Sequence, residues 1–481
     1  MRRARAATAG LGLALTLGLV AATGSPATAA DPLDVDDLDR ATDRAASAAE
    51  QALDQAPQRA LERAPGLGAG SSTSDAVAED LPLTGFEASG GATWTTLEEE
   101  YAFLEEVAAR SERVRLEQVA TTAQGRPLTL VTVTDGEERS VEEIASGASA
   151  LVLCLQHGNE PAAREGCLQG LRDLAFSDDP ADLRMLERST VLFVPTVNPD
   201  GRAANTRANS EGIDINRDHI ALESAEARAV AELTRDLDPE ILHDAHEYGG
   251  NRTFYNRDFI HLWPRNLNVD DKVYGLARSL VLDYVDVAVV EGGYTTGEYG
   301  IYYDPETGEP VRQVAGDQDE RILRNATGLR HTAGLLVESL VNDFDGVGPV
   351  ANNLRRVDTQ VLGIEGTLDM LARDGSLLVA QTRAAERRAV AEGLSGNAVV
   401  YFDGADNTEP TQVVEAPCAY VLTDEQHADL ADTLALHDIA VTDGTDGWTV
   451  SMAQPAKTVI PLLLDERARF ELVAATPVDC R

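Results

Sequence analysis

Hydrophobic and polar positions divide the chain into stretches of different character. Residues 31–64 are rich in Asp, Ala, Arg and Glu, and 64–74 (APGLGAGSSTS) has the composition of a flexible linker. From about position 92, stretches with apolar residues at helical spacing alternate with short apolar runs. The run 150–155 (ALVLCL) is apolar throughout, as expected for a central strand covered on both faces. This alternation predicts an α/β fold with helices on both faces of a sheet.

The same pattern gives the expected elements and domains. Helices are predicted at 97–110, 164–176, 224–237 and 272–284, and a long, mostly helical stretch at 350–394. Strands are predicted at 116–122, 128–133, 150–155, 191–197, 240–245, 285–290 and 334–339. After about position 345 the rhythm weakens and a smaller mixed unit follows. We therefore expect a flexible N-terminal segment (31–91), a main domain (92–345) and a helical stretch with a small C-terminal extension (346–481).

The first thirty residues have the pattern of a secretory signal peptide. Arg2, Arg3 and Arg5 precede an apolar run, and small residues lead up to Ala30. We therefore expect export of the protein, with cleavage near Ala30. No later run approaches about eighteen consecutive apolar residues, so no membrane span is predicted in the mature protein.

Charge and cysteine content argue against some binding partners and against one kind of metal site. The net charge is −41, which argues against binding of nucleic acid through its phosphates. A salty habitat and an ordinary acidic exported protein both fit this charge. An exported protein can form disulfides, and the four cysteines allow three pairings, of which sequence proximity favours Cys154–Cys167 and Cys418–Cys480. No cysteines form a C-x-x-C pair, which argues against a cysteine zinc site.

Two strand ends carry residues that can bind a metal ion. His157 and Glu160 follow the predicted strand 150–155, and His246 follows the strand 240–245. Ligands bind at the carboxyl ends of strands in α/β sheets, and two His with one Glu is a catalytic zinc donor set. His243 is an alternative to His246. Because the two side chains point to opposite faces of a strand, only one of them can reach the site, and we favour the one at the strand's exit.

Further polar residues cluster after the other strands. A predicted turn, 198–201 (NPDG), is followed by Arg207, Asn216 and Arg217, which can form a clamp for a carboxylate. Glu338 ends the apolar strand 334–339, where a carboxyl group can act as a general base on metal-activated water. The same position also suits a strand-end residue that faces solvent.

In this order and spacing, the motifs resemble the zinc carboxypeptidase family, also called funnelins, over about residues 92–345. The resemblance implies an α/β/α sandwich with a mixed sheet of about eight strands. It also implies one zinc ion per chain and a role for each matching residue. These are zinc ligands His157, Glu160 and His246, carbonyl-polarising Arg207, carboxylate-binding Asn216 and Arg217, general base Glu338, and a substrate-capping tyrosine among Tyr294, Tyr299, Tyr302 and Tyr303.

The resulting prediction is a secreted zinc metallocarboxypeptidase that acts on peptides with a free C-terminal carboxylate. One alternative is a zinc deacylase that cuts N-acyl amino acids with the same core. Another is a non-catalytic binding protein on the same fold. The preferred terminal residue and the oligomeric state are left open.

Overall fold

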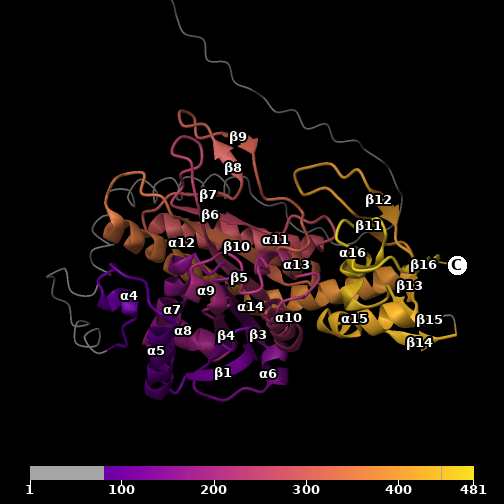
Figure 1. Ribbon diagram of the computed structural model, residues 1–481, viewed down its shortest axis with the longest axis horizontal. Helices are drawn as coiled ribbons and strands as arrows, with labels where there is room; N and C mark the ends of the chain where they lie inside the picture. The colour runs from indigo at the N-terminus through magenta and orange to yellow at the C-terminus, as the bar shows by residue number, and fades with distance from the viewer. Residues whose placement is uncertain (1–80, 446, 481) are drawn as a thin grey trace, which may run out of the picture. The chain divides into compact units, whose positions relative to one another are not determined.

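The computed structural model describes residues 81–445 and 447–480, so the predicted signal peptide and most of the segment 31–91 lie outside the described residues. An eight-stranded sheet forms the centre of the described part, in the order β1-β2-β4-β3-β5-β10-β6-β7 (Figure 1). Its strands are β1 (Val114–Thr121), β2 (Pro127–Val133), β3 (Ala148–Cys154), β4 (Ser189–Val194), β5 (Ile241–Tyr248), β6 (Phe259–Leu262), β7 (Thr296–Glu298) and β10 (Ala333–Leu340).

The sheet is mixed. Its four central strands, β4, β3, β5 and β10, run parallel, whereas β1, β2 and β6 join by antiparallel pairing. The predicted α/β fold with a mixed sheet of about eight strands is therefore confirmed. Parallel strands place their carboxyl ends at one edge, and we call the edge where β3, β5 and β10 end the carboxyl edge.

Helices cover both faces of the sheet. The main helices are α5 (Leu97–Arg110), α6 (Val141–Ser146), α7 (Pro161–Phe176), α8 (Pro180–Leu186), α9 (Pro199–Ala204), α10 (Ala225–Leu237), α11 (Asp271–Ser279), α12 (Asp286–Glu291), α13 (Leu323–Leu329) and α14 (Pro349–Ser395). Alternate residues along a strand point to opposite faces. Val152 of β3 belongs to a core with α5, α7 and α14, whereas its neighbours Leu151 and Leu153 pack in a second core with α10.

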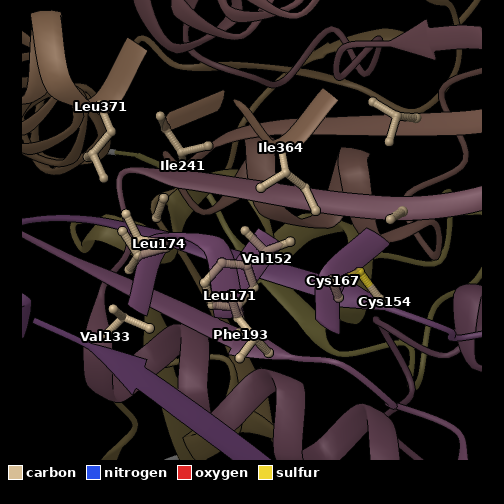
Figure 2. Packing of buried hydrophobic residues seen from close by; sticks show 14 of the residues in the cluster. Val133, Val152, Cys154, Cys167, Leu171, Leu174, Phe193, Ile241, Ile364 and Leu371 are labelled. Carbon is tan, nitrogen blue, oxygen red and sulfur yellow. A yellow bond between two sulfur atoms is a disulfide. The ribbon is translucent and has the colours of Figure 1, made fainter. Parts of the chain in front are cut away.

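Figure 2 shows the larger of these cores, in which side chains of the helices pack against side chains of the sheet. Leu171 and Leu174 of α7 and Ile364 of α14 pack with Val152 and Phe193 of the sheet. Cys154 at the end of β3 forms a disulfide with Cys167 of α7. The core thus fixes the end of β3, after which the predicted metal-binding loop begins.

The predicted strand 285–290 is wrong. The chain is helical there, with a π-helical turn η2 (Leu280–Val285) leading directly into α12. Val281, Val285 and Val289 are buried at intervals of four and pack in the core that α14 contributes to. A short apolar run fits a strand or a buried helix equally well, and packing decided here for the helix. The sheet instead contains β6 between β10 and β7, and the sequence pattern did not predict this strand.

The chain beyond α14 packs in a further core, which also includes Ala385 of α14 and Val269, Val273 and Leu329 from earlier in the chain. An antiparallel sheet β14-β15-β13-β16 packs with α15, and a second disulfide, Cys418–Cys480, closes the region. Both disulfides have the pairing that sequence proximity favours. The elements are β11 (Val399–Tyr401), β12 (Val413–Glu415), β13 (Ala419–Leu422), α15 (Asp424–Leu436), β14 (Thr442–Gly444), β15 (Gly447–Ser451), η3 (Pro455–Thr458), α16 (Ile460–Leu464) and β16 (Thr476–Val478).

The predicted helical stretch 350–394 is the single helix α14, which packs against α7, β3 and β10. The predicted domain boundaries, including the one at 345, stay predictions. Among the described helices, none combines the length and the apolar character that crossing a membrane requires.

Candidate active site

The carboxyl edge of the sheet brings together the three predicted metal ligands. The chain turns sharply after β3 because Leu155 adopts a left-handed conformation with φ of 59°. His157 and Glu160 lie in the following loop, directly before α7 begins at Pro161. Gly158 allows this loop to approach α9, because an added Cβ would lie 2.0 Å from the carbonyl carbon of Gly201. The structure therefore needs glycine between the two predicted ligands.

The donor atoms of His157, Glu160 and His246 converge on one point. The Nδ1 atom of His157 lies 2.8 Å from Oε1 of Glu160, and Nδ1 of His246 lies 2.9 Å from Oε2 of the same carboxylate. The two Nδ1 atoms are 3.0 Å apart. All three side chains are buried, and two imidazoles with one carboxylate suit zinc. The donor set therefore fits the metal that the sequence predicts.

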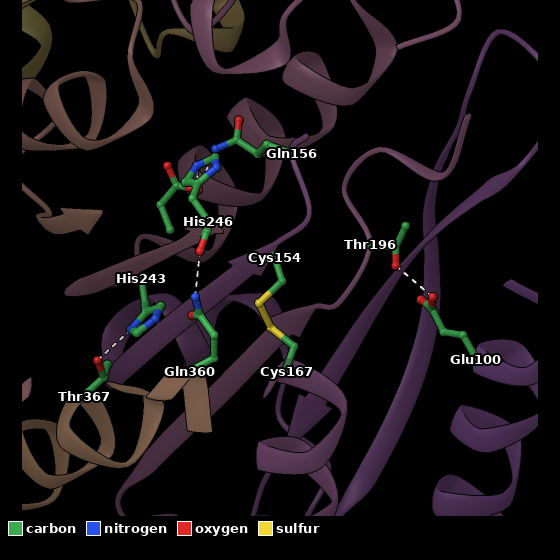
Figure 3. Close-up of a disulfide and its surroundings, with 10 residues drawn as sticks. Glu100, Cys154, Gln156, Cys167, Thr196, His243, His246, Gln360 and Thr367 are labelled. Carbon is green, nitrogen blue, oxygen red and sulfur yellow. Dashed lines mark hydrogen bonds and ion pairs between the residues drawn. A yellow bond between two sulfur atoms is a disulfide. The ribbon is translucent and has the colours of Figure 1, made fainter. Parts of the chain in front are cut away.

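The choice between His246 and His243 follows from the two faces of β5. His243 points away from the cluster, and its Nδ1 lies 2.8 Å from Oγ1 of Thr367 on α14 (Figure 3). The backbone carbonyl of His246 accepts a hydrogen bond from Gln360 of the same helix, while its imidazole lies in the cluster. The structure thus brings His246, and not His243, to the other two ligands.

Acidic groups around the cluster hold the imidazoles in place. Nε2 of His246 lies 2.9 Å from Asp244, and Nε2 of His157 lies 3.2 Å from Asp214. Burial opposes the charge of Glu160, but the adjacent imidazoles outweigh burial and lower the pKa of Glu160 to about 2. Asp214 was not singled out from the sequence as a partner of His157, since only the tertiary structure places the two side chains together.

Glu247, the residue after His246, contacts a proposed ligand through its backbone and not through its side chain. Its backbone N–H donates to Glu160 at 3.2 Å. Its carboxylate accepts hydrogen bonds from Arg356 at 2.7 Å and from the backbone of Ala162 at 3.1 Å. The side chain therefore anchors α14 and the start of α7 to β5.

Glu338 lies beside His246 on the neighbouring strand. The two residues are paired in register between β10 and β5, so both side chains leave the same face of the sheet. Burial raises the pKa of the Glu338 carboxyl to about 8; His246 opposes the shift, and the negative charge of Glu160 adds to it. The side chain is buried and lines the pocket next to the ligands, so it does not face solvent.

The predicted arginines and Asn216 line the same pocket, each with different contacts. Arg207 is about half exposed and donates to Asp214 at 3.0 Å. Asn216 is buried, with its amide nitrogen 2.9 Å from Nε2 of His246 and its oxygen accepting from the backbone of Leu323. Arg217 donates to the backbone carbonyl of Asn216 and forms no ion pair within the described part of the chain.

The pocket has a volume of about 290 Å³ and holds further residues that sequence reasoning missed. Tyr299 is the one member of the four tyrosine candidates that lines it. The phenol of Tyr294 instead donates to Asp358 at 2.7 Å. Tyr255 and Arg324 also line the pocket. No local motif marks either of them, because they come from the loop after β5 and from α13.

The segment 198–201, predicted as a turn, differs from that prediction in detail. Asn198 caps helix α9, with its side chain accepting from the N–H of Gly201 at 2.8 Å. The predicted turn is therefore the first turn of a short helix. Asp200 in that turn accepts a hydrogen bond from Arg126 at 2.6 Å, which ties α9 to the loop between β1 and β2.

Comparison with known proteins supports the interpretation of this pocket. Residues 100–248 match the family model of the zinc carboxypeptidases. The resemblance to zinc carboxypeptidases is confirmed. The matching segment contains His157, Glu160 and His246, whereas Glu338 lies beyond it.

Proteins named as carboxypeptidases match parts of the chain. Carboxypeptidase 2 of Trichophyton tonsurans is 32% identical over 190 residues, which make up 38% of this chain and 35% of that protein. Carboxypeptidase E of Caenorhabditis elegans is 29% identical over 126 residues, covering 23% of this chain and 26% of that protein. The chain thus spans about a third of the length of the fungal carboxypeptidases that it matches.

Solved carboxypeptidase structures match more of the chain at lower identity. A metallo-carboxypeptidase from Burkholderia cenocepacia is 18% identical with a TM-score of 0.43, covering 57% of this chain and 69% of that chain. Carboxypeptidase A from Helicoverpa armigera is 13% identical with a TM-score of 0.45, covering 60% of this chain and 75% of that chain.

Proposed function

We propose that this protein is a secreted zinc metallocarboxypeptidase that hydrolyses the C-terminal peptide bond of peptides. The observation that carries the proposal is the convergence of His157, Glu160 and His246 in a pocket that Glu338 also lines. The three proposed ligands lie in the segment that matches the zinc carboxypeptidase family model. One zinc ion per chain, when bound, supplies a Lewis acid that polarises a carbonyl oxygen and lowers the pKa of water.

The side chains around the pocket have separate tasks in this proposal. Arg217, which has no ion pair within the described residues, binds the terminal carboxylate of the peptide, with Asn216 beside it. Arg207 reaches the cluster from the half-exposed rim and donates hydrogen bonds to the carbonyl oxygen of the bond to be cut. Tyr299 lies on the pocket wall, where it can cover a bound residue.

Glu338 acts as the general base. The positive charge of a bound zinc ion would favour the ionised form of Glu338. Its carboxylate then accepts a proton from the attacking water, whose oxygen bonds to the carbonyl carbon. The proton then passes to the leaving amine as the C–N bond breaks, which releases the terminal amino acid. The register of Glu338 beside His246 supports this role, because it puts the base next to the proposed zinc ligands.

Replacing Glu338 by Gln tests the assignment. We expect turnover to fall by about 10²- to 10⁴-fold, because proton transfer is lost, while zinc content stays at that of the wild type. The assay follows release of the last residue from a blocked tripeptide, with metal content measured in parallel. Glu106→Gln is the control, because Glu106 is exposed on α5, pairs there with Arg110 and does not line the pocket. Wild-type turnover in Glu338→Gln would remove the residue from the mechanism.

Three substrates and a chelator separate the proposed activity from its alternatives. We expect the tripeptide with a free carboxylate to be cut, the same peptide amidated at its C-terminus to resist, and an N-acyl amino acid to be cut poorly. Preferred cleavage of the acyl amino acid would indicate a deacylase. Chelation should abolish cleavage and zinc should restore it, whereas a chain that binds no metal would support the non-catalytic alternative.

Secretion is the remaining part of the proposal. Two disulfides, Cys154–Cys167 and Cys418–Cys480, suit an oxidising compartment outside the cytosol. The basic and apolar start of the chain fits a signal peptide. Mass spectrometry of the protein in the medium of a secreting host should find Asp31 at or near the N-terminus, and retention of the protein in the cells would contradict export.

A further inference from the structure

We propose that Arg324 binds a side-chain carboxylate of the substrate, so that the enzyme prefers peptides that end in glutamate or aspartate. This inference rests on the proposed carboxypeptidase function and names the preferred substrate of the same pocket. Three observations support it: Arg324 is buried, it forms no ion pair in the described residues, and it lines the pocket of the proposed zinc ligands.

Arg324 is buried without a carboxylate partner. Its side chain lies at the start of α13 and is 1% exposed. One terminal nitrogen donates to the backbone carbonyl of Asp317 at 2.8 Å, whereas Nε has no hydrogen-bond partner. Burial lowers the pKa of Arg324 to about 10, so the group keeps its positive charge at neutral pH. A buried charge with such incomplete pairing disfavours the folded protein unless an anion binds to it.

This state is unusual among the buried arginines of the described residues. Five arginines are buried there: Arg164, Arg172, Arg265, Arg324 and Arg356. Four of them form ion pairs, with Glu100, Glu87, Glu298 and Glu247. Arg324 forms none within the same part of the chain. The fold therefore supplies partners for the other buried guanidinium groups and leaves this one for a ligand.

The position of Arg324 identifies the kind of ligand. It lines the pocket of about 290 Å³ that contains the three proposed zinc ligands. Of the three arginines on this wall, Arg207 is paired with Asp214, whereas Arg217 and Arg324 have no ion pair in the described part of the chain. Two unpaired guanidinium groups suit a ligand with two carboxylates. A terminal glutamate or aspartate offers both, one on the main chain for Arg217 and one on the side chain for Arg324.

The other residues that line the pocket do not favour another class of side chain on the last residue of the substrate. Tyr255, Tyr299 and Leu336 give aromatic and apolar surface around the guanidinium. A terminal lysine or arginine would bring a second positive charge close to the buried guanidinium of Arg324, which is unfavourable. A large apolar side chain would fill the same space and leave the guanidinium without an anion. A charged hydrogen bond contributes about 1.5–3 kcal/mol, which corresponds to roughly 10- to 150-fold in kcat/KM.

The test uses four peptides that differ only in the last residue, which is Glu, Gln, Leu or Lys. Glu and Gln have nearly the same shape, so their ratio measures the charge. In the wild type, we expect kcat/KM to be at least about tenfold higher for Glu than for Gln, and lowest for Lys. In Arg324→Met the Glu-to-Gln ratio should fall close to one, whereas Arg324→Lys should keep part of the preference because it keeps the charge. Circular dichroism checks that the variants fold.

Arg373→Gln is the matched control. Arg373 is 67% exposed on α14, where it pairs with Asp369 and lies over the ring of Tyr284, and it does not line the pocket, so its loss should leave the Glu-to-Gln ratio unchanged. The wild-type ratio requires no variant, and it decides the matter even if Arg324→Met fails to fold. Cleavage of the peptides with a ratio at or below one would overturn this inference and leave the proposed carboxypeptidase intact.

A second series separates the proposed function from the role of Arg324. It uses N-acetyl-glutamate and N-acetyl-glutamine. Cleavage of these compounds with the same preference for Glu, and no cleavage of the peptides, would overturn the peptidase but support the carboxylate-binding role of Arg324. No cleavage of either series, with zinc bound, would overturn both.

Discussion

Buried arginines in two regions of the molecule have opposite surroundings. In α7, Arg164 contacts two carboxylates, Glu100 at 3.1 Å and Glu165 at 3.4 Å, and also the backbone carbonyl of Thr95. In the pocket at the carboxyl edge, Arg324 contacts a single backbone carbonyl. The same chemical group is thus satisfied by the fold in one place and left to a ligand in the other.

The difference shows which region is built for stability and which for binding. A buried guanidinium cannot give up its proton at physiological pH, so it needs an anion close by. Where the anion belongs to the chain, as in the pair of Arg164 with Glu100, the pair joins α7 to α5. Arg324 has no such anion in the described residues. Its unpaired charge lowers the stability of the folded protein but is retained because it binds a ligand, as expected of functional sites.

A buried carboxyl group can avoid this cost in a way that an arginine cannot. Glu240, at the opposite end of β5 from His246, is buried and forms no ion pair in the described residues. It accepts a hydrogen bond from the backbone N–H of Ser149 at 2.7 Å. Burial raises the pKa of Glu240 to about 8, so the group is protonated and uncharged at neutral pH.

The largest effect should come from breaking the paired arginine. Arg164→Met leaves Glu100 and Glu165 buried beside each other without their cation, and we expect the free energy of unfolding to fall by about 3–5 kcal/mol. Urea denaturation of the zinc-loaded protein measures this. Arg373→Met, at the exposed position on α14, should change the same quantity by less than about 0.5 kcal/mol. If Arg164→Met lowered the free energy of unfolding by a similarly small amount, the proposed difference between the two regions would be wrong.

A smaller effect, with a defined pH dependence, is expected at Glu240. Its pKa is above the ordinary value in the folded protein, so its contribution to stability is complete below about pH 4.5 and is lost as pH rises through about 8. Glu240→Gln cannot ionise. We therefore expect its unfolding free energy to fall less between pH 5 and pH 9 than that of the wild type, by at least about 1 kcal/mol.

Denaturation curves at several pH values check the Glu240 prediction. Glu106→Gln serves as the control, because Glu106 is exposed and should give the pH profile of the wild type. Parallel pH profiles for Glu240→Gln and the wild type would show that the carboxyl is ionised in both the folded and unfolded states.

The smallest effect on stability should come from the unpaired arginine. Arg324→Met removes a buried charge and one hydrogen bond to a backbone carbonyl, and it leaves no carboxylate without a partner. We expect unfolding free energy to change by less than about 1 kcal/mol, in either direction. The same urea experiment as for Arg164→Met compares the two directly. A loss of several kcal/mol would give Arg324 a structural role and contradict the proposed contrast.

Much of this protein could be predicted from the sequence. The apolar run at 150–155 and the residues that follow it predicted β3 and the loop of His157 and Glu160. These signals are local, because a buried strand and the polar residues at its exit are neighbours in the chain. The predicted strand at 285–290 failed for the same reason, since a short apolar run carries no period that separates a strand from a buried helix.

What the sequence determined by itself was the set of chemical groups and the strands that present them: two imidazoles and a carboxylate at strand exits, and Glu338 at the end of another strand. Only the tertiary structure decided which groups meet. It turned His246 toward the cluster and His243 toward Thr367, brought Asp214 to His157, and placed Arg324 in the pocket without a carboxylate. The physical reason is that strand order and packing bring together residues as distant in the chain as His157 and Glu338, which are 181 positions apart, and no local period in the chain records which of them will be neighbours.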